Sequence, residues 1–331
     1  MPGSFKRLLV TGGCGFIGSH FVRYVLQTAR PELVVNLDKL TCAGRPENVA
    51  DVAQDRRYRF VRGDIADAGL VDRVAREEKL DAVVNFAAES HVDRSLQSAA
   101  DFARTNVQGT QVLVEAARRR GIRRFLQVST DEVYGSLGPT GRFTESSPLN
   151  PSNPYSASKA GADLLVLAGA RSFGQDVVVT RHSNNYGPHQ HPEKLIPKLI
   201  TNAMQDQPLP LYGDGGNVRD WLFVHDNARA VHLALEKGRA GEVYNVGGNS
   251  GRTNLEVARA ILKILGKPES LIRFVTDRPG HDRRYAMDAS KIEAEAGFRP
   301  SLPFEVGLRT TVDWYRKNEA WVRAVRSPAA S

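Results

Sequence analysis

The stretch Thr11-Gly12-Gly13-Cys14-Gly15-Phe16-Ile17-Gly18 decides how this chain of 331 residues folds. It follows an apolar run at residues 8–10, and a helical pattern covers residues 17–29, so the glycines lie at a strand-to-helix turn. Without side chains, Gly12, Gly15 and Gly18 let the backbone approach a pyrophosphate, to which the helix N-terminus offers N–H groups and a positive dipole. The stretch therefore predicts a dinucleotide site at the start of an α/β domain.

An acid after the second apolar run, residues 33–37, agrees with this prediction. Asp38 follows the glycines by about twenty residues, where a carboxylate hydrogen-bonds an adenosine ribose. A carboxylate there repels a 2′-phosphate and favours NAD over NADP, although Lys39 and Arg45 nearby weaken this argument. Asp64, after the strand-like run at 59–62, either faces the adenine or caps the next helix.

Strand-like and helical patterns alternate through the first half of the chain. Further strands are predicted at residues 7–10, 82–86, 125–128 and 177–180, and helices at 69–78, 102–120 and 155–173. Such alternation is typical of a Rossmann-type, doubly wound parallel sheet with helices on both faces. The strands are almost continuously apolar, as expected when both faces of a sheet are covered.

The pattern changes after about residue 182, where Pro and Gly become frequent. A helix at 225–236 and a strand at 243–246 are predicted to return to the main sheet. We therefore expect an NAD-binding Rossmann domain of residues 1–181 with about 222–247. A smaller, mixed α/β substrate lobe takes residues 182–221 and 248–331. Its predicted elements are helices at 195–204, 254–265, 289–296 and 304–318 and a strand at 272–275.

Composition excludes several classes of protein. Hydrophobic residues make up 41% and charged residues 25%, as in a globular chain, and no apolar run is long enough for a membrane span. With only Cys14 and Cys42, and no signal-peptide pattern, we expect a cytoplasmic enzyme. The net charge is +8, but the one dense basic run, residues 118–124, lies at a predicted helix end, so no nucleic-acid partner is expected.

The chemistry is expected where the fifth strand ends, at Ser129-Thr130-Asp131-Glu132. Ligands of open parallel sheets bind at the carboxyl ends of the strands. Tyr155 and Lys159 follow, and helical residues four apart share a face. An ammonium beside a phenol lowers the phenol's pKa, which would make Tyr155 a base for a hydroxyl proton. The alternative is a structural acid pair and an exposed helical pair.

These motifs together resemble the extended short-chain dehydrogenase/reductase family, and within it the dTDP-glucose 4,6-dehydratases, over nearly the whole chain. The segments that carry the resemblance are TGGCGFIGSHFVR at 11–23, FAAESHVDRS at 86–95, STDEVYG at 129–135, PYSASKAG at 154–161, NNYGPHQHPEKLIP at 184–197, LPLYGDGGNVRDW at 209–221 and DRPGHDRRYAMD at 277–288. Similar 4-epimerases lack both acids of the Asp131-Glu132 pair, and similar glucuronate decarboxylases carry one. Cys14 stands where the family usually has Ala.

The resemblance implies a lyase that acts on a nucleoside-diphosphate sugar with a tightly bound NAD, regenerated in each turnover. Tyr155, aided by Thr130, would deprotonate the 4-hydroxyl as hydride leaves carbon 4. Glu132 would then remove the proton on carbon 5, Asp131 would protonate the departing 6-hydroxyl, and hydride would return to carbon 6. These opposite roles require a protonated Asp131 beside an ionised Glu132. A UDP-glucose 4,6-dehydratase, a 4-epimerase and a non-catalytic NAD sensor remain alternatives.

The resemblance also implies contact residues. Those for the cofactor are Gly12, Gly15, Phe16, Ile17, Gly18, Asp38, Lys39, Leu40, Thr41, Gly44, Asp64, Ile65, Phe86, Ala87, Ala88, Ser90, Thr105, Ser129, Tyr155, Lys159 and Asn185. Those for the substrate are Ser90, Thr130, Asp131, Glu132, Asn184, Glu193, Lys194, Leu195, Pro210, Leu211, Tyr212, Arg219, Asn254, Asp277, Arg278, Pro279, Gly280 and His281. No residue decides between thymine and uracil. No metal site is expected, because the histidines lack acids at ligand spacing.

Finally, the resemblance implies a homodimer in which the helices at 102–120 and 155–173 pair as a four-helix bundle. Apolar positions on the first of these helices, Val107, Val112 and Leu113, belong either to that interface or to the internal core.

Overall fold

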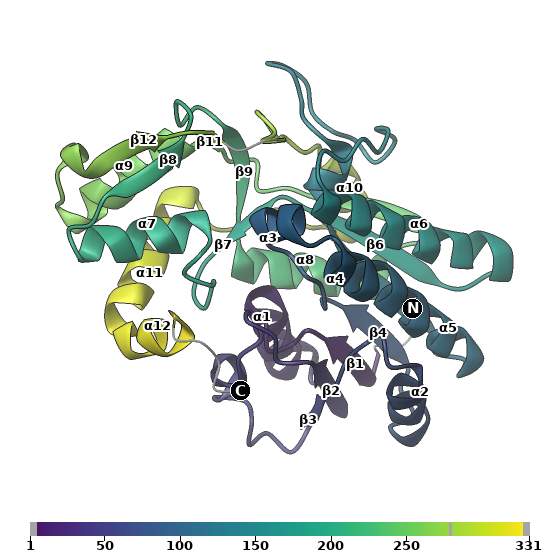
Figure 1. The fold of residues 1–331 in the computed structure, drawn as a ribbon. Helices are drawn as coiled ribbons and strands as arrows, with labels where there is room; N and C mark the ends of the chain where they lie inside the picture. The colour runs from purple at the N-terminus through teal and green to yellow at the C-terminus, as the bar shows by residue number, and fades with distance from the viewer. Residues whose placement is uncertain (1–4, 278–279, 327–331) are drawn as a thin grey trace.

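The computed structural model describes residues 5–277 and 280–326. At its centre is a seven-stranded parallel sheet in the order β10-β6-β5-β4-β1-β2-β3 (Figure 1). The predicted doubly wound α/β fold is confirmed. The strands of this sheet are β1 (Arg7–Thr11), β2 (Leu33–Asp38), β3 (Tyr58–Arg62), β4 (Ala82–Asn85), β5 (Arg124–Thr130), β6 (Val177–His182) and β10 (Glu242–Val246).

Helices cover both faces of the sheet (Figure 1). One layer holds α1 (Phe16–Tyr24), α8 (Val224–Lys237) and α10 (Ser290–Ala296), and the other holds α2 (Ala68–Glu77), α5 (Thr110–Arg119) and α6 (Pro154–Phe173). Successive strand residues point to opposite faces, so Leu8 and Val10 join the first core and Leu9 joins the second. Most positions on the central strands are buried, which is why these strands carry apolar runs, whereas the edge strand β3 has no fully buried position.

Two predicted helices contain π-helical segments. The first helix continues from α1 into η1 (Val25–Ala29). The helix expected at 102–120 is divided into α4 (Ala100–Phe102), η3 (Ala103–Gly109) and α5. Such π segments are often found near functional sites, and η3 carries Thr105, which lines the cavity described below.

The C-terminal half adds two small sheets and a second core. The sheets contain β7 (Asn184–Tyr186), β8 (Leu209–Tyr212), β9 (Val218–Phe223), β11 (Gly251–Thr253) and β12 (Ile272–Val275), in the orders β11-β9-β7 and β12-β8. The core lies between α7 (Leu195–Met204), α9 (Asn254–Leu265), α11 (Phe304–Lys317) and α12 (Glu319–Arg326). The division of the chain into two domains stays our prediction. None of the described helices is long and apolar enough to cross a membrane.

Candidate active site

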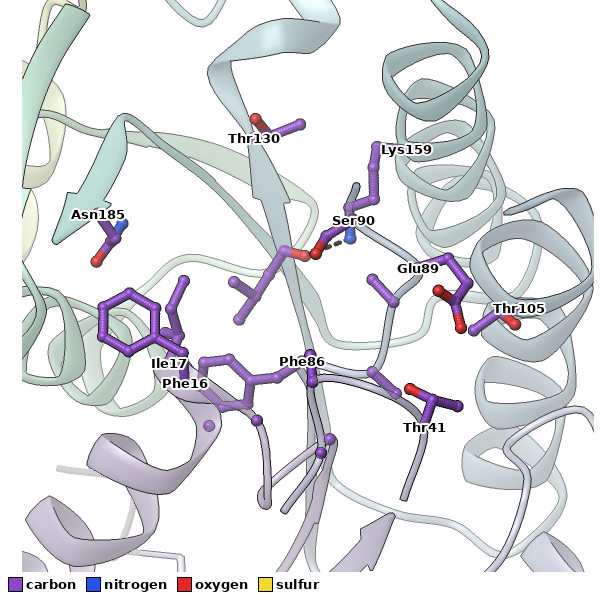
Figure 2. A pocket seen from close by; sticks show the side chains of 18 of the residues that line it. Phe16, Ile17, Thr41, Phe86, Glu89, Ser90, Thr105, Thr130, Lys159 and Asn185 are labelled. Atoms are coloured by element: carbon purple, nitrogen blue, oxygen red, sulfur yellow. Dashed lines mark hydrogen bonds between the residues drawn. The ribbon is translucent and has the colours of Figure 1, made fainter. Parts of the chain in front are cut away.

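One cavity lies at the carboxyl ends of the central strands, between the glycine turn after β1 and the first turns of α6 (Figure 2). In a doubly wound sheet this is where the crevice for a ligand opens. The cavity brings together the predicted catalytic residues Thr130, Asp131, Glu132, Tyr155 and Lys159. Figure 2 shows that Phe16, Ile17 and Phe86 lie across the cavity from Thr130 and Lys159.

Most of the predicted contact residues line the same cavity. Of the cofactor set, each residue except Leu40 does so. The substrate set contributes Ser90, Thr130, Asp131, Glu132, Asn184, Glu193 and Lys194. The other lining residues were not among the predicted contacts; they are Leu37, Ala43, Gly63, Glu89, Val128, His182, Ser183, Gln190 and His191.

The glycine turn fits a pyrophosphate. Gly12 has a φ of 68°, and a Cβ there would lie 2.7 Å from the backbone nitrogen of Ala87. A Cβ on Gly18 would overlap the carbonyl oxygen of Gly12, so the helix packs directly on the turn. Gly15 is the N-cap of α1 and supplies no side-chain cap, which leaves the first N–H groups of the helix for an anionic ligand.

Asp38 is held at the end of β2 by two backbone hydrogen bonds. Its carboxylate accepts hydrogen bonds from the backbone N–H of Cys14 at 2.9 Å and of Leu40 at 2.8 Å, and burial raises its pKa. Leu40 thus contributes to the site through its backbone. A Cβ on Gly44 would lie 2.6 Å from Asp38 Oδ1, so the absence of a side chain keeps the carboxylate accessible.

Lys39 and Arg45, the cations near Asp38 that weakened the argument for NAD over NADP, have other partners. Lys39 Nζ lies 3.0 Å from Asp64 Oδ2, and Arg45 donates to the carbonyl oxygen of Val325 at 3.3 Å. Asp64 is not the helix cap, because the side chain of Asp67 caps α2 by accepting from Leu70 N at 3.0 Å.

The two acids occupy a single turn, η4 (Asp131–Tyr134), directly after β5. Thr130 begins this turn, since its Oγ1 accepts from Glu132 N at 3.2 Å and also lies 3.3 Å from Asp131 Oδ1. Asp131 is 1% exposed, and burial, followed by the charge of Glu132, raises its pKa well above the ordinary value. Within the described residues, Asp131 Oδ2 has no hydrogen-bond partner. The geometry therefore favours a protonated Asp131 with one oxygen left for a ligand.

Tyr155 and Lys159 lie at the start of α6, whose position is fixed by Pro154 in its first turn and by a capping box between Asn153 and Ser156. Lys159 is 4% exposed and donates to the carbonyl oxygen of Val128 at 2.7 Å (Figure 2). Burial lowers the pKa of Lys159 to about 8.

The expectation that Lys159 lowers the pKa of Tyr155 is wrong. The pKa of Tyr155 is not lowered but raised, first by burial and then by the charge of Glu132, while the hydrogen bond to Thr130 opposes the increase. Burial is the main cause, and Lys159 does not offset it, because its amine is directed at a backbone carbonyl whereas the carboxyl groups of η4 lie beside the phenol.

A site residue that the sequence analysis missed is Asn106 on η3. Its side chain accepts from Glu89 N at 2.9 Å and donates to Glu89 O at 3.0 Å and to Ser158 Oγ at 2.8 Å. It therefore fixes the loop after β4 against α6, next to Lys159. The sequence carries no distinct signal for this role, because the burial of Asn106 is seen only in the structure.

The remaining predicted substrate residues do not line the cavity. Arg219 on β9 lies with its guanidinium carbon 4.3 Å from the Tyr285 ring centre and donates to Asp282 O at 2.9 Å. Its charge nevertheless lowers the pKa of Asp131, so it lies close to the catalytic turn. The other residues of this group are Leu195, Pro210, Leu211, Tyr212, Asn254, Asp277, Gly280 and His281. Arg278 and Pro279 lie outside the described residues.

Three of these outlying residues form a local unit. Tyr212 and His281 pack edge to face with ring centres 5.8 Å apart, and His281 Nδ1 lies 2.6 Å from Asp277 Oδ1. The side chain of Leu211 instead lies in the second core, so only its backbone is available to a ligand. Residues 5–277 and 280–326 contain no group of three or more His, Cys, Asp or Glu side chains able to hold a metal ion.

Comparison with known proteins identifies the family. The family model described as GDP-mannose 4,6 dehydratase matches residues 9–311. A dTDP-glucose 4,6-dehydratase of Streptomyces niveus is 55% identical over 97% of this chain and 96% of its own length. A dTDP-glucose 4,6-dehydratase of Xanthomonas campestris pv. campestris is 53% identical over 96% of this chain and 95% of its own length.

Solved structures are similar to this chain over nearly its whole length. A dTDP-glucose 4,6-dehydratase of Streptomyces venezuelae, solved with NAD bound, is 54% identical with a TM-score of 0.94, and covers 97% of this chain and 100% of its own. A UDP-glucose 4-epimerase of Thermus thermophilus in complex with NAD is 34% identical with a TM-score of 0.87, and covers 94% and 99%. The chain therefore belongs to the GDP-mannose 4,6 dehydratase family of the extended short-chain dehydrogenase/reductases.

Proposed function

We propose that this chain is an NAD-dependent dTDP-glucose 4,6-dehydratase. It converts dTDP-glucose to dTDP-4-keto-6-deoxyglucose by oxidation at carbon 4, elimination of water across carbons 5 and 6, and reduction at carbon 6. The observation that carries the proposal is the buried Asp131 beside Glu132, in the same cavity as Tyr155 and Lys159. A 4-epimerase exchanges hydride at one carbon and has no need of a second acid–base pair.

The cofactor fits the first part of the cavity. Gly12 and Gly18 give it backbone access, the uncapped N-terminus of α1 faces its pyrophosphate, and Asp38 holds its adenosine ribose. When bound, NAD supplies a hydride acceptor and, once reduced, a hydride donor. The chain keeps the cofactor through the whole cycle, so no second redox substrate is consumed.

The proton on the sugar's 4-hydroxyl passes to Tyr155. Because burial and Glu132 raise the pKa of Tyr155, the phenolate needs a positive partner. Lys159, one helical turn further along α6, carries that charge below pH 8 or so. The hydrogen bond from Thr130, which lowers the Tyr155 pKa, adds to the effect.

Water is lost through the two acids of η4. Glu132 takes the proton from carbon 5, which is acidified by the ketone at carbon 4, and Asp131 donates its proton to the departing 6-hydroxyl. After donation the Asp131 carboxylate is stabilised by Arg219, whose charge favours its ionised form, and by the hydrogen bond of Thr130. Two neighbouring acids with separate protonation states thus perform both halves of the elimination.

We assign the nucleoside-diphosphate group of the substrate to residues on β8, β9 and the segment after β12. We assign the diphosphate to Arg219, whose planar guanidinium suits phosphate oxygens, and the base to the unit of Tyr212, Asp277 and His281. Asn184, Glu193 and Lys194 line the cavity between these groups and the catalytic turn.

The test is to incubate the purified protein separately with dTDP-glucose and UDP-glucose without added NAD. We expect a 4-keto-6-deoxy sugar from dTDP-glucose, detected by mass spectrometry. A product from UDP-glucose alone would transfer the assignment to that substrate. Absence of a ketone, or a need for continuous NAD supply, contradicts the dehydratase proposal.

We also propose a homodimer formed through the helices of the α6 layer, working in the cytoplasm. Leu164 on α6 is 56% exposed, and Ala157 and Ala168 are exposed on the same face of the helix. Of the positions on the preceding helix, Leu113 belongs to the internal core and Val112 packs against it. The interface therefore uses α6 more than those residues. Both cysteines are free, as in a reducing compartment.

A further inference from the structure

A buried carboxyl group lies one helical turn beyond Lys159. Tyr155, Lys159 and Asp163 are spaced four residues apart on α6, so they share one face of the helix. The Asp163 side chain is 0% exposed and does not line the cavity. Arg181 on β6, 4% exposed, donates from Nε to Asp163 Oδ2 at 2.9 Å. A buried ion pair is costly to desolvate, so its presence behind an active site needs an explanation.

Arg181 connects this pair to the catalytic turn. Its Nη1 donates to Tyr134 Oη at 2.9 Å, and its guanidinium carbon lies 4.8 Å from the Tyr134 ring centre. Tyr134 Oη donates in turn to Asn245 Oδ1 at 2.7 Å. Because Tyr134 ends η4, the turn of Asp131 and Glu132, the buried network joins the helix of Lys159 to the turn of the two acids.

The charges in this network act on Lys159. Burial lowers the pKa of Lys159 to about 8, and Asp163 is the group that opposes this decrease. Burial raises the pKa of Asp163, and the charges of Arg181 and Lys159 oppose that increase. Arg181 therefore favours an ionised Asp163, and an ionised Asp163 favours a charged Lys159.

The other titratable groups around Lys159 do not replace Asp163. His182 on β6 faces Lys159, but burial lowers the pKa of its imidazole to about 3, so it is neutral. Burial raises the pKa values of Tyr155 and Asp131, which favours their neutral forms, and the charge of Glu132 acts on both groups. Three arginines on the helices packed against α6 have partners elsewhere, in the pairs Arg94–Glu193, Arg104–Asp64 and Arg119–Glu115.

We propose that Asp163 is a positioning residue that keeps the Lys159 amine in its charged form, with Arg181 holding Asp163 ionised. The proposed function needs that charge, because the ammonium favours the Tyr155 phenolate. The inference rests on the proposed function for the role of Lys159, but not for its protonation state, which is measurable without substrate.

The experiment measures the Lys159 amine directly. The purified chain is pulsed with acetic anhydride across a pH series, and acetylation of Lys159 is quantified by peptide mass spectrometry. Asp163→Asn is expected to lower the pH midpoint of labelling by about one unit or more, since an adjacent opposite charge shifts a pKa by that amount. Turnover of dTDP-glucose by the NAD-loaded variant should fall at alkaline pH and recover towards wild type as the pH decreases, which a merely structural defect would not produce.

A double variant and a control complete the design. Asp163→Asn alone leaves the Arg181 guanidinium buried without its carboxylate, which is destabilising, whereas Asp163→Asn with Arg181→Met removes both charges and predicts the same labelling midpoint. Tyr134→Phe keeps both charges and should label like wild type. A wild-type midpoint in both Asp163 variants overturns the proposal. If the midpoint is lowered in the Asp163 variants but the wild-type chain does not turn over dTDP-glucose, the inference stands and the proposed function is wrong.

Discussion

Asp131 and Glu132 are neighbours in sequence, yet their surroundings differ. Asp131 is buried, with one oxygen that lacks a partner among the described residues, whereas Glu132 is partly exposed. The pKa of Asp131 is therefore raised well above its ordinary value, first by burial and then by the charge of its neighbour. Sequence therefore identifies the two acids, but the burial that raises the pKa of Asp131 is visible only in the structure.

The two acids should be separable by mutation. In Glu132→Gln the proton on carbon 5 has no base, so exchange of that proton with solvent deuterium should stop. In Asp131→Asn exchange should continue while water loss slows by about 10²- to 10⁴-fold, the usual contribution of a general acid. Mass spectrometry of recovered substrate and product measures both. Equal exchange in the two variants contradicts the assignment of roles.

Lys159 should make the free energy of unfolding depend on pH. Between pH 8 and 10.5 the folded chain has released the Lys159 proton while the unfolded chain still holds it, so this group makes stability rise with pH. Lys159→Met removes that contribution. The variant should therefore exceed wild type in unfolding free energy at pH 7, by a few kcal/mol at most at about 1.4 kcal/mol per pKa unit, with the excess vanishing towards pH 10.5. Urea denaturation at both pH values measures this, and a constant difference would contradict the prediction.

At the scale of elements, the sequence predicts what has a local pattern. Strands β1, β2 and β4 to β6 carry apolar runs because both of their faces are covered, and α6 begins at Pro154 after a capping residue, so periodicity and turn chemistry locate them. Strands β7 and β11 have three residues each and exist only because they pair with β9, which is distant in sequence. Such strands carry no periodicity to detect, and the protonation state of Tyr155 likewise depends on groups from another element.

The strand-turn-helix unit at the cofactor end gives a prediction at this scale. In Gly18→Ala the new Cβ overlaps the backbone of Gly12, which must shift the turn that we assign to the pyrophosphate. We expect a loss of NAD from the purified protein, measured after denaturation by chromatography, and a destabilisation of about 1–3 kcal/mol. Gly138→Ala is the matched control, because a Cβ there meets nothing within 4 Å. Full NAD retention in Gly18→Ala would contradict the assigned role of the turn.

At the scale of the whole molecule, the proposed site combines residues from the main sheet with residues from the small sheets. The strands of the main sheet supply the cavity with its cofactor and catalytic groups, whereas Arg219 and the Tyr212–His281 unit come from the small sheets and the segment after β12. The sequence indicates these residues through their resemblance to a family, not through any local pattern, because they lie on elements distant in sequence from η4.

The exposed face of α6 gives the last prediction. Leu164 is 56% exposed at the centre of a stripe with Ala157 and Ala168, and an interface between two copies would bury it against its counterpart. Leu164→Glu places two charges opposite each other across that interface, so the dimer should dissociate and sedimentation should give the mass of one chain. Val306→Glu is the control, since Val306 is 50% exposed on α11, outside the α6 layer, and should leave the mass unchanged. A wild-type chain that sediments as a monomer would contradict the dimer. A Leu164→Glu variant that stays dimeric would place the interface on another face.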